Sequence, residues 1–469
     1  VMLQISYDWL VSKIKKVFPF IFNRFSLVSL LVGLLLIIVI DCNSRSYTKP
    51  KPQLSTKVIS LNPLNPRPRP MFGAHFNFAD PPNELIFHMV MKDKRPILAK
   101  ALRDAGVEDL RISFHGYYSH LGHQESLKLR EINKLSNAFP WIPAEVFISF
   151  MKDFGFTTVL GVNVEEGPQV AIDLLKRFEK ADALGLISSI ELGNEPFLSA
   201  RPWTPEEYAQ KSAEIIKALR PFKVKFAIAV IVGKDNNGPT KIPGNEYCDR
   251  TLATLDPLID LKNSDDIYGA VHLYSRGVTP IAIDQFNQII RKYSKMKYQV
   301  TEYNIRLSLK GNPHLTNAYA MEFARKLNQL IMSPDIVGFW IHSFPYHAIN
   351  YWTDGKTSTV IGFTDSKLEV EDLTPGWHLT PAGKVHHFYQ SLAWNGDILA
   401  FYEEGNVQYW VINSPTKGKL VSVLNDQYEP LEKVISFEDK KLPVQVKGQE
   451  IVCYELDSGK QLSSLTLSH

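Results

Sequence analysis

The chain has 469 residues, of which 45% are hydrophobic and 22% are charged, and its formal net charge is +3. This apolar fraction excludes a disordered polymer, and so small a net charge gives no reason to expect a nucleic-acid partner. Three cysteines are too few for a disulfide scaffold or a cysteine-rich zinc module. The length is sufficient for one large domain and a smaller one.

The N-terminal segment is basic and contains one long apolar stretch. Residues 25–40 carry no charge and consist mainly of Leu, Ile and Val. This is close to the ~17–20 residues that a membrane-spanning helix needs. Residues 1–24 hold four basic side chains against Asp8 alone, which favours the cytoplasmic side. We therefore predict a cytoplasmic segment over 1–24, a transmembrane anchor over 25–42 and an extracytoplasmic remainder.

Three other interpretations of this segment stay open. It could be a cleaved signal peptide, or a helix buried in a core. It could also be a lipoprotein signal with Cys42 as the acylated residue, although Asp41 then stands where a small residue is expected. In each case except the core helix, the rest of the chain lies outside the cytoplasm, in the periplasm or at the cell surface of a bacterium.

A proline-rich basic tether follows over residues 43–70. It contains six prolines and six Lys or Arg residues with no acid, which is typical of an extended, semi-rigid linker. Its stretch 56–61 has a β-rich pattern and is a candidate strand for another domain; a solvated linker is the alternative.

From residue 71 onward, short apolar runs alternate with amphipathic helical patterns. The eight runs are 71–78, 108–114, 156–164, 186–192, 224–232, 266–274, 297–303 and 336–344. Helical patterns include 171–183, 205–219, 281–292, 316–331 and 381–392. This alternation predicts a (β/α)₈ TIM barrel, of class α/β, over residues 71–392. A doubly wound sheet is the rival fold, but the glycine-rich phosphate loop that such a sheet would normally carry does not follow an early run.

After residue 392 the pattern changes to short runs separated by polar turns. These runs are 398–402, 407–413, 419–424, 434–437 and 450–456. They predict a C-terminal antiparallel β-sandwich domain over 393–469.

Polar side chains cluster where the eight runs end, which is where a barrel of this kind carries its active site. They are His75, Asn77, Arg111, Asn163, Asn194, Glu195, His272, Tyr274, Glu302, Trp340 and His342. Two of them, Glu195 and Glu302, are carboxylates that come directly at the end of an apolar run. Glycoside hydrolysis needs two such carboxyl groups on either side of the scissile bond, one protonated and one ionised.

Two motifs carry a resemblance to a known group of enzymes. The sequence Ile-Glu-Leu-Gly-Asn-Glu-Pro over 190–196, together with Val-Thr-Glu-Tyr-Asn over 300–304, resembles the retaining glycoside hydrolases of clan A. Within the clan it is similar to the heparanase/β-glucuronidase, arabinofuranosidase and β-xylosidase groups. The resemblance implies that Glu195 is the acid/base and Glu302 the nucleophile.

The resemblance also implies supporting roles. Asn194 would bind the sugar 2-hydroxyl, and Arg111 would lie beneath the nucleophile and keep it ionised. Tyr274, or alternatively His272, would hydrogen-bond Glu302. The stretch 380–389 resembles the last barrel helix of these enzymes, in which the chain continues into a β-sandwich that often receives a strand from the N-terminal extension.

The remaining strand-end residues are candidate substrate contacts. They are His75, Asn77, Asn163, His342 and Trp340, the last by stacking on a sugar face; packing is the alternative for the tryptophan. The histidines lack a metal-ligand spacing, so we expect neither a metal nor a cofactor. Cys248 and Cys453 show no sign of being paired.

These observations predict a membrane-tethered, extracytoplasmic retaining glycoside hydrolase whose partner is a carbohydrate substrate. The same motifs serve xylosides, arabinosides, glucuronides and β-glucans, so the sugar stays open, as does the oligomeric state. Arg276 and Arg306 are candidate contacts for a uronate. The alternatives are a carbohydrate-binding or scaffold subunit of a polysaccharide synthesis or export machine, and a transglycosylase.

Overall fold

A computed structural model of the chain describes residues 57–76, 95–113, 144–197, 203–232, 241–274, 280–305, 315–344, 350–353, 374–393 and 395–467. The predicted anchor over 25–42 and the first part of the tether lie outside these ranges, as do Asn77, Arg276 and Arg306. Within them, no helix is both long and apolar enough to cross a membrane. Cys248 and Cys453 are buried free thiols.

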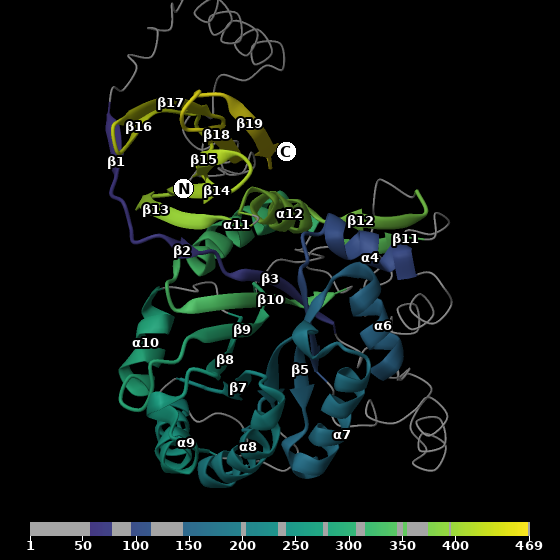
Figure 1. Ribbon diagram of the computed structural model, residues 1–469. Coiled ribbons are helices and arrows are strands. Elements are labelled where there is room, and N and C mark those ends of the chain that lie inside the picture. The colour runs from purple at the N-terminus through teal and green to yellow at the C-terminus, as the bar shows by residue number, and fades with distance from the viewer. Residues whose placement is uncertain are drawn as a thin grey trace, which may run out of the picture. The chain divides into compact units, whose positions relative to one another are not determined.

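A closed parallel barrel of eight strands forms the larger domain (Figure 1). The strands follow one another around it in chain order, and the eighth pairs with the first. They are β3 (Met71–Phe76), β4 (Asp109–Ser113), β5 (Thr157–Val162), β6 (Ile187–Leu192), β7 (Phe226–Ala229), β8 (Ile267–Leu273), β9 (Tyr298–Tyr303) and β10 (Ile336–Phe344). Each lies within one of the eight predicted runs, so the barrel prediction is confirmed.

Burial on both faces explains why these strands read as nearly continuous apolar runs. All six residues of β9 are buried, and so are five of the six in β6. Side chains on one face fill the barrel, and those on the other pack against the surrounding helices. Such a strand carries no alternation of polar and apolar residues, and its sequence therefore does not show which side chains point inward.

The helices that surround the barrel are amphipathic. Helix α8 begins with a capping box, in which Thr204 and Glu207 satisfy each other's backbone N–H groups, and Pro205 occupies the first turn. The helices are α4 (Arg95–Asp104), α6 (Ala144–Phe154), α7 (Gly167–Lys180), α8 (Pro205–Leu219), α9 (Gly244–Ile259), α10 (Pro280–Ile290), α11 (Asn317–Met332) and α12 (Pro381–Ala393). Single 3₁₀ turns are η1 (Val164–Glu166), η2 (Leu184–Leu186), η3 (Arg220–Phe222) and η5 (Leu261–Asn263).

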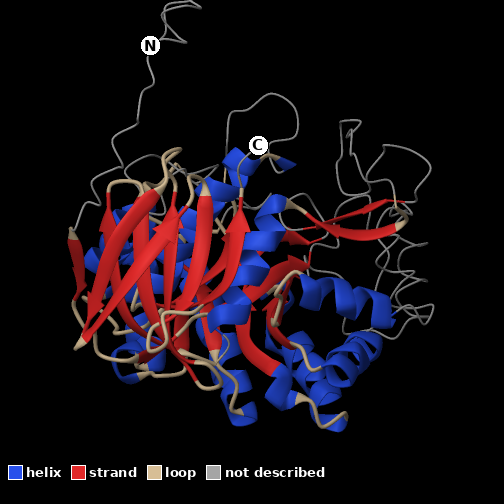
Figure 2. Cartoon of the chain, turned by 90° about the horizontal axis from the view of Figure 1, so that it is seen from above, coloured by secondary structure: helices blue, strands red, loops and turns tan. Residues whose placement is uncertain are grey.

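The C-terminal domain consists of two sheets that share an apolar core. One has the strand order β1-β16-β17, in which β1 is Val58–Leu61, and the other has the order β19-β18-β15-β14-β13-β2, in which β2 is Arg67–Pro68. The long strands of this domain lie side by side in Figure 2. They are β13 (Asp397–Glu404), β14 (Val407–Ser414), β15 (Gly418–Asn425), β16 (Leu431–Phe437), β17 (Lys440–Val446), β18 (Glu450–Glu455) and β19 (Gln461–Thr466). The antiparallel β domain predicted after residue 392 is confirmed.

Two strands of this domain, β17 and β19, were not among the predicted runs. β17 alternates exposed and buried residues and includes two lysines and Pro443, and β19 is mostly exposed. Both lie at the edge of a sheet, where charge, proline and exposure are common. An edge strand of this kind gives no apolar run in the sequence.

The end of the tether supplies two strands to the β domain. β1 (Val58–Leu61) pairs in parallel with β16, and β2 (Arg67–Pro68) pairs with β13. Ile59 and Leu61 enter the apolar core of the domain, while Val58 faces outward. The candidate strand over 56–61 thus lies in the sheet. A separate ribbon is formed by β11 (Asn350–Thr353) and β12 (Gly376–Leu379).

The barrel and the β domain meet at α11 and α12, which lie between them in Figure 1. The buried Asn328 of α11 donates from Nδ2 to Tyr389 of α12 and to Gln408 of β14. Trp410 and Ile412 of β14 belong to the same apolar core as the barrel helices. This junction holds the two domains as one packed body.

Candidate active site

The candidate catalytic residues come from four barrel strands and meet at the carboxyl ends of those strands. Arg111 lies on β4, Glu195 three residues after β6, His272 on β8, Tyr274 just after β8, and Glu302 on β9. Because parallel barrel strands end on the same rim, residues up to 191 positions apart in sequence become direct neighbours.

Arg111 is the centre of this cluster and is fully buried. Its Nη1 donates to Glu302 Oε1 at 2.7 Å and to His75 Nδ1 at 3.2 Å. Its Nη2 donates to Asn194 Oδ1 at 2.6 Å and to Glu191 Oε1 at 3.0 Å, and its Nε to Glu191 Oε2 at 2.5 Å. These are the five N–H groups of a guanidinium, and each has a partner. The side chain is therefore fixed in one orientation.

Glu302 is held as an ionised carboxylate. Its Oε1 accepts from Arg111, and its Oε2 accepts a short hydrogen bond from the hydroxyl of Tyr274. Burial by itself would raise the pKa of Glu302, but the charge of Arg111, followed by that of His272, lowers this pKa well below its ordinary value. Burial and the neighbouring carboxylate raise the pKa of Tyr274, so this phenol stays a hydrogen-bond donor at neutral pH.

Glu195 has a different environment. Its side chain is 30% exposed against 8% for Glu302, and its Oε1 lies 2.8 Å from His272 Nδ1. It adopts a left-handed backbone conformation with φ of 44°, shortly after Gly193 with φ of 75°. A non-glycine residue in this region costs free energy and is often found at functional sites. Tyr208 of α8 fixes the start of this turn by donating its hydroxyl to the carbonyl of Leu192.

His272 lies close to both carboxylates. Its Nδ1 is 2.8 Å from Glu195 Oε1 and 3.5 Å from Glu302 Oε2. The two facing carboxylate oxygens can therefore be no farther apart than these two distances together. An approach this close between single oxygens is compatible with the ~5–5.5 Å carboxyl separation of retaining glycosidases.

Of the two residues expected to hydrogen-bond Glu302, Tyr274 makes the bond. His272 lies nearer to Glu195 than to Glu302.

His75 and His342 lie on the neighbouring strands β3 and β10, with ring centroids 4.8 Å apart. With Glu302 they form a group of two imidazoles and one carboxylate whose ligand atoms lie within 4.8 Å of one another. Such a set suits a transition metal. However, Arg111 Nη1 already binds both Glu302 Oε1 and His75 Nδ1, and a cation there disfavours a second one.

Comparison with protein-family models gave no match, and neither did comparison with curated proteins. Solved structures do match. An endo-β1,6-glucanase is 13% identical with a TM-score of 0.54, covering 85% of this chain and 94% of its own. A GH39 β-xylosidase from Caulobacter crescentus is 13% identical with a TM-score of 0.52, covering 82% and 84%. A family 51 α-L-arabinofuranosidase from Bifidobacterium longum is 12% identical with a TM-score of 0.53, covering 86% and 94%.

The chain has the fold of these glycoside hydrolases. The resemblance to clan A is thereby confirmed at the level of architecture, across both the barrel and the β domain. At 12–13% identity the likeness establishes the fold, and the chemistry must be argued from the side chains.

The prediction that Trp340 stacks on a sugar is wrong. It is 1% exposed and donates from Nε1 to Asp109 Oδ1 at 2.7 Å. In the register of β10 against β3, Trp340 lies opposite Gly73. His342 lies opposite His75, two residues nearer the carboxyl ends of the strands. A Cβ on Gly73 would lie 2.2 Å from the indole, so the missing side chain makes room for the ring. Trp340 therefore packs inside the barrel, below the layer of the carboxylates.

Asn163 does not join the cluster in any contact described. Its Oδ1 accepts from the backbone N–H of Glu165 at 3.0 Å and caps the short turn η1. Its side chain is therefore engaged in holding the β5 loop.

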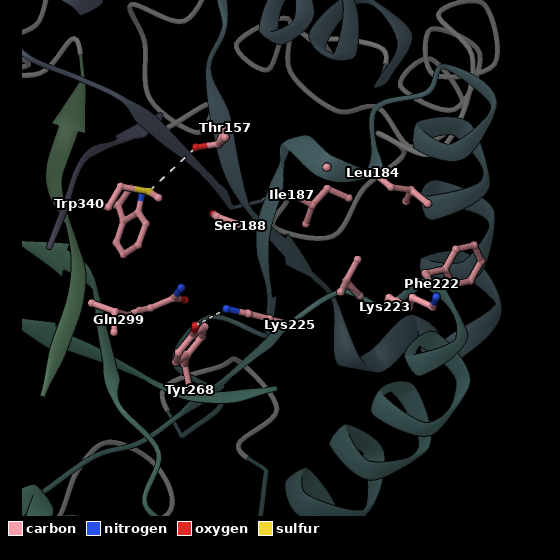
Figure 3. A pocket seen from close by; sticks show the side chains of 14 residues that line it. Thr157, Leu184, Ile187, Ser188, Phe222, Lys223, Lys225, Tyr268, Gln299 and Trp340 are labelled. Atoms are coloured by element: carbon pink, nitrogen blue, oxygen red, sulfur yellow. Dashed lines mark hydrogen bonds between the residues drawn. The ribbon is translucent and has the colours of Figure 1, made fainter. Parts of the chain in front are cut away.

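The amino-terminal mouth of the barrel contains a cavity of about 510 Å³ (Figure 3). Trp340 and Gln299 line it together with Lys225 and Tyr268, which hydrogen-bond to each other. It lies at the strand starts, at the opposite end of the barrel from the two carboxylates. In a barrel of this kind, residues at that face serve stability.

Glu191 is a member of the cluster that the sequence analysis missed. It lies on β6, is 2% exposed, and makes two of the five bonds of Arg111. Its signal was present, because a carboxylate inside an otherwise uncharged strand run needs a buried cation.

Proposed function

We propose that this protein is a retaining glycoside hydrolase that acts on an extracytoplasmic polysaccharide or glycoside. The observation that carries the proposal is that carboxylate oxygens of Glu195 and Glu302 both lie within 3.5 Å of His272 Nδ1, one residue partly exposed and the other buried against Arg111. The fold of the solved glycoside hydrolases supports the same conclusion.

In the first step, an ionised oxygen of Glu302 attacks the anomeric carbon while the bond from that carbon to the leaving oxygen breaks. Glu195 gives its proton to this oxygen, so the leaving group departs neutral. The product is a glycosyl ester on Glu302. Arg111 and Tyr274 hold the carboxylate in place through its two oxygens.

In the second step, Glu195 is a carboxylate and takes a proton from water. The oxygen of this water attacks the anomeric carbon, the ester bond breaks, and Glu302 leaves as a carboxylate. The exposure of Glu195 suits a group that must reach both a leaving group and water. The second displacement restores the original anomeric configuration.

The decisive experiment is a screen of the wild-type chain and Glu302→Gln on 4-nitrophenyl glycosides of xylose, arabinose, glucose and glucuronic acid. We expect hydrolysis of at least one by the wild type, and a loss of about 10⁴-fold or more in the variant. Glucuronide hydrolysis would point to a uronate substrate. Activity of Glu302→Gln at the wild-type level would overturn the assignment of the nucleophile.

Glu195→Gln tests the acid/base separately. Its loss of kcat should be about 10²–10⁴-fold for poor leaving groups, which need protonation, and much smaller for the formation of the ester from a dinitrophenyl glycoside. Rates would be measured over a series of phenols of different acidity. Equal losses across the series would contradict the acid role of Glu195.

The membrane tether is part of this proposal and rests on the sequence of residues 25–42. We expect the full chain to stay with the membrane fraction after alkaline carbonate extraction. A version lacking residues 1–56 should be released from the membrane, because it lacks the anchor. It keeps both strands that the tether contributes to the β domain, since these begin at Val58. Release of the uncleaved full chain would rule out a spanning anchor.

A further inference from the structure

Glu191 makes no described contact with Glu195 or Glu302, yet it makes two hydrogen bonds with Arg111, which also binds Glu302 and Asn194. We propose that Glu191 is a positioning residue that acts through Arg111 to orient the amide of Asn194 for binding a sugar hydroxyl. This inference rests on the proposed function and names a residue on which its rate depends.

Glu191 fixes the plane of the Arg111 guanidinium. A guanidinium is planar, and its Nε and Nη2 atoms form one edge that fits a carboxylate. Glu191 occupies this edge, with Oε2 at 2.5 Å from Nε and Oε1 at 3.0 Å from Nη2. With the plane fixed in this way, the second N–H of Nη2 points at Asn194 Oδ1 and Nη1 serves Glu302.

Arg111 in turn fixes the orientation of the Asn194 amide. Arg111 has only donors, so the Asn194 atom 2.6 Å from Nη2 must be the acceptor oxygen. The Nδ2 group of Asn194 is then the one that can donate to a substrate hydroxyl. If Arg111 released Oδ1, the amide would be free to rotate and present either atom.

The charge of Glu191 competes with that of Glu302 for Arg111. Arg111 lies between two buried carboxylates, Glu191 and Glu302, and each of them raises its pKa against the effect of burial. Without a charge at position 191, the guanidinium would turn toward Glu302, because an ionised carboxylate outcompetes a neutral amide as an acceptor. Asn194 would then lose its partner, while Glu302 would keep one.

The experiment is a double-mutant cycle on kcat/KM with Glu191→Gln, Asn194→Ala and the double variant. The substrates are the best 4-nitrophenyl glycoside from the screen and its 2-deoxy counterpart. Asp109→Asn is the matched control, because it also replaces a fully buried acid by its amide, at the other end of the barrel. The thermal midpoint of every variant would be measured alongside.

We expect Glu191→Gln to lose about 100-fold in kcat/KM, mainly in kcat, since the contact to the sugar hydroxyl strengthens in the transition state. The kcat/KM of the double variant should lie no more than about threefold below that of Asn194→Ala. The preference of Glu191→Gln for the 2-hydroxy substrate over the 2-deoxy one should collapse, whereas Asp109→Asn should keep the wild-type preference.

Losses that multiply in the double variant, or an undiminished preference for the 2-hydroxyl, would overturn the proposal and leave Glu191 a merely structural partner of Arg111. If Glu191→Gln does not fold, Glu191→Asp gives the test, because it keeps the charge and shortens the reach; the same two criteria apply. A wild-type chain without glycosidase activity would instead count against the proposed function.

Discussion

The two ends of the barrel each bury a carboxylic acid, and they treat it in opposite ways. At the carboxyl end, Glu302 faces the guanidinium of Arg111, and its pKa is lowered well below the ordinary value. At the amino end, the donors that the described residues offer to Asp109 are neutral, among them Thr157, Trp340 and the N–H of Val159. There burial prevails and raises the pKa of Asp109 to about 6.

The difference shows that burial alone does not identify a functional acid. Desolvation raises the pKa of both carboxyl groups, and a buried cation reverses the sign for one of them. A buried cation costs several kcal/mol to desolvate unless an opposite charge pairs with it. Arg111 is thus what distinguishes the surroundings of Glu302 from those of Asp109.

Removing this cation should have the largest effect. Arg111→Met leaves Glu191 and Glu302 buried without a counter-charge, so we expect a loss of ~3–5 kcal/mol in unfolding free energy and about 10³-fold in kcat/KM. Urea titration and kinetics on the same preparation measure the two effects. Arg69→Met is the control, because Arg69 forms a largely buried pair with Glu108 outside the cluster. It should lose stability and keep kcat/KM; equal activity losses in both would contradict a special role for Arg111.

The opposite pKa shifts predict opposite dependence of stability on pH. Between about pH 4 and pH 6, Asp109 keeps its proton in the folded state, whereas in the unfolded chain it has lost this proton. As the pH rises through this range, the unfolding free energy of the wild type should therefore fall by ~3 kcal/mol relative to that of Asp109→Asn. For Glu302 the folded state holds the proton less tightly than the unfolded chain. The wild type should therefore lose stability relative to Glu302→Gln as pH falls below about 4.5.

Denaturant titrations of the three proteins from pH 3.5 to pH 7 measure both differences. Curves that run in the same direction for the two variants would mean that Arg111 does not reverse the effect of burial.

The smallest effect is expected at Trp340. Trp340→Phe keeps a ring in the space beside Gly73 and removes the Nε1 donor to Asp109. The loss of this hydrogen bond should lower the unfolding free energy by about 1–2 kcal/mol. Because the indole lies in the amino-terminal half of the barrel, kcat/KM should stay within about twofold of the wild type. A large rise in KM would instead restore Trp340 as a substrate contact.

The sequence by itself determined the architecture and the two carboxylates. Apolar runs typical of strands alternate along the sequence with amphipathic patterns typical of helices, and this alternation predicted the order of elements around the barrel. Each pattern reflects how the element buries its apolar side chains. Glu195 and Glu302 could be found because chain order places strand ends on one rim. The β1 strand could be proposed from its local pattern, but its partner β16 lies more than 370 residues away.

Only the tertiary structure decided which side chains meet. Strands buried on both faces have no polar alternation, so their sequence shows neither the inward side nor the depth in the barrel. Trp340 and His342 are two residues apart on β10, yet one packs beside Asp109 and the other beside His75. The five bonds of Arg111 likewise join four strands, and a hydrogen-bond network of this kind depends on distances that no local pattern contains.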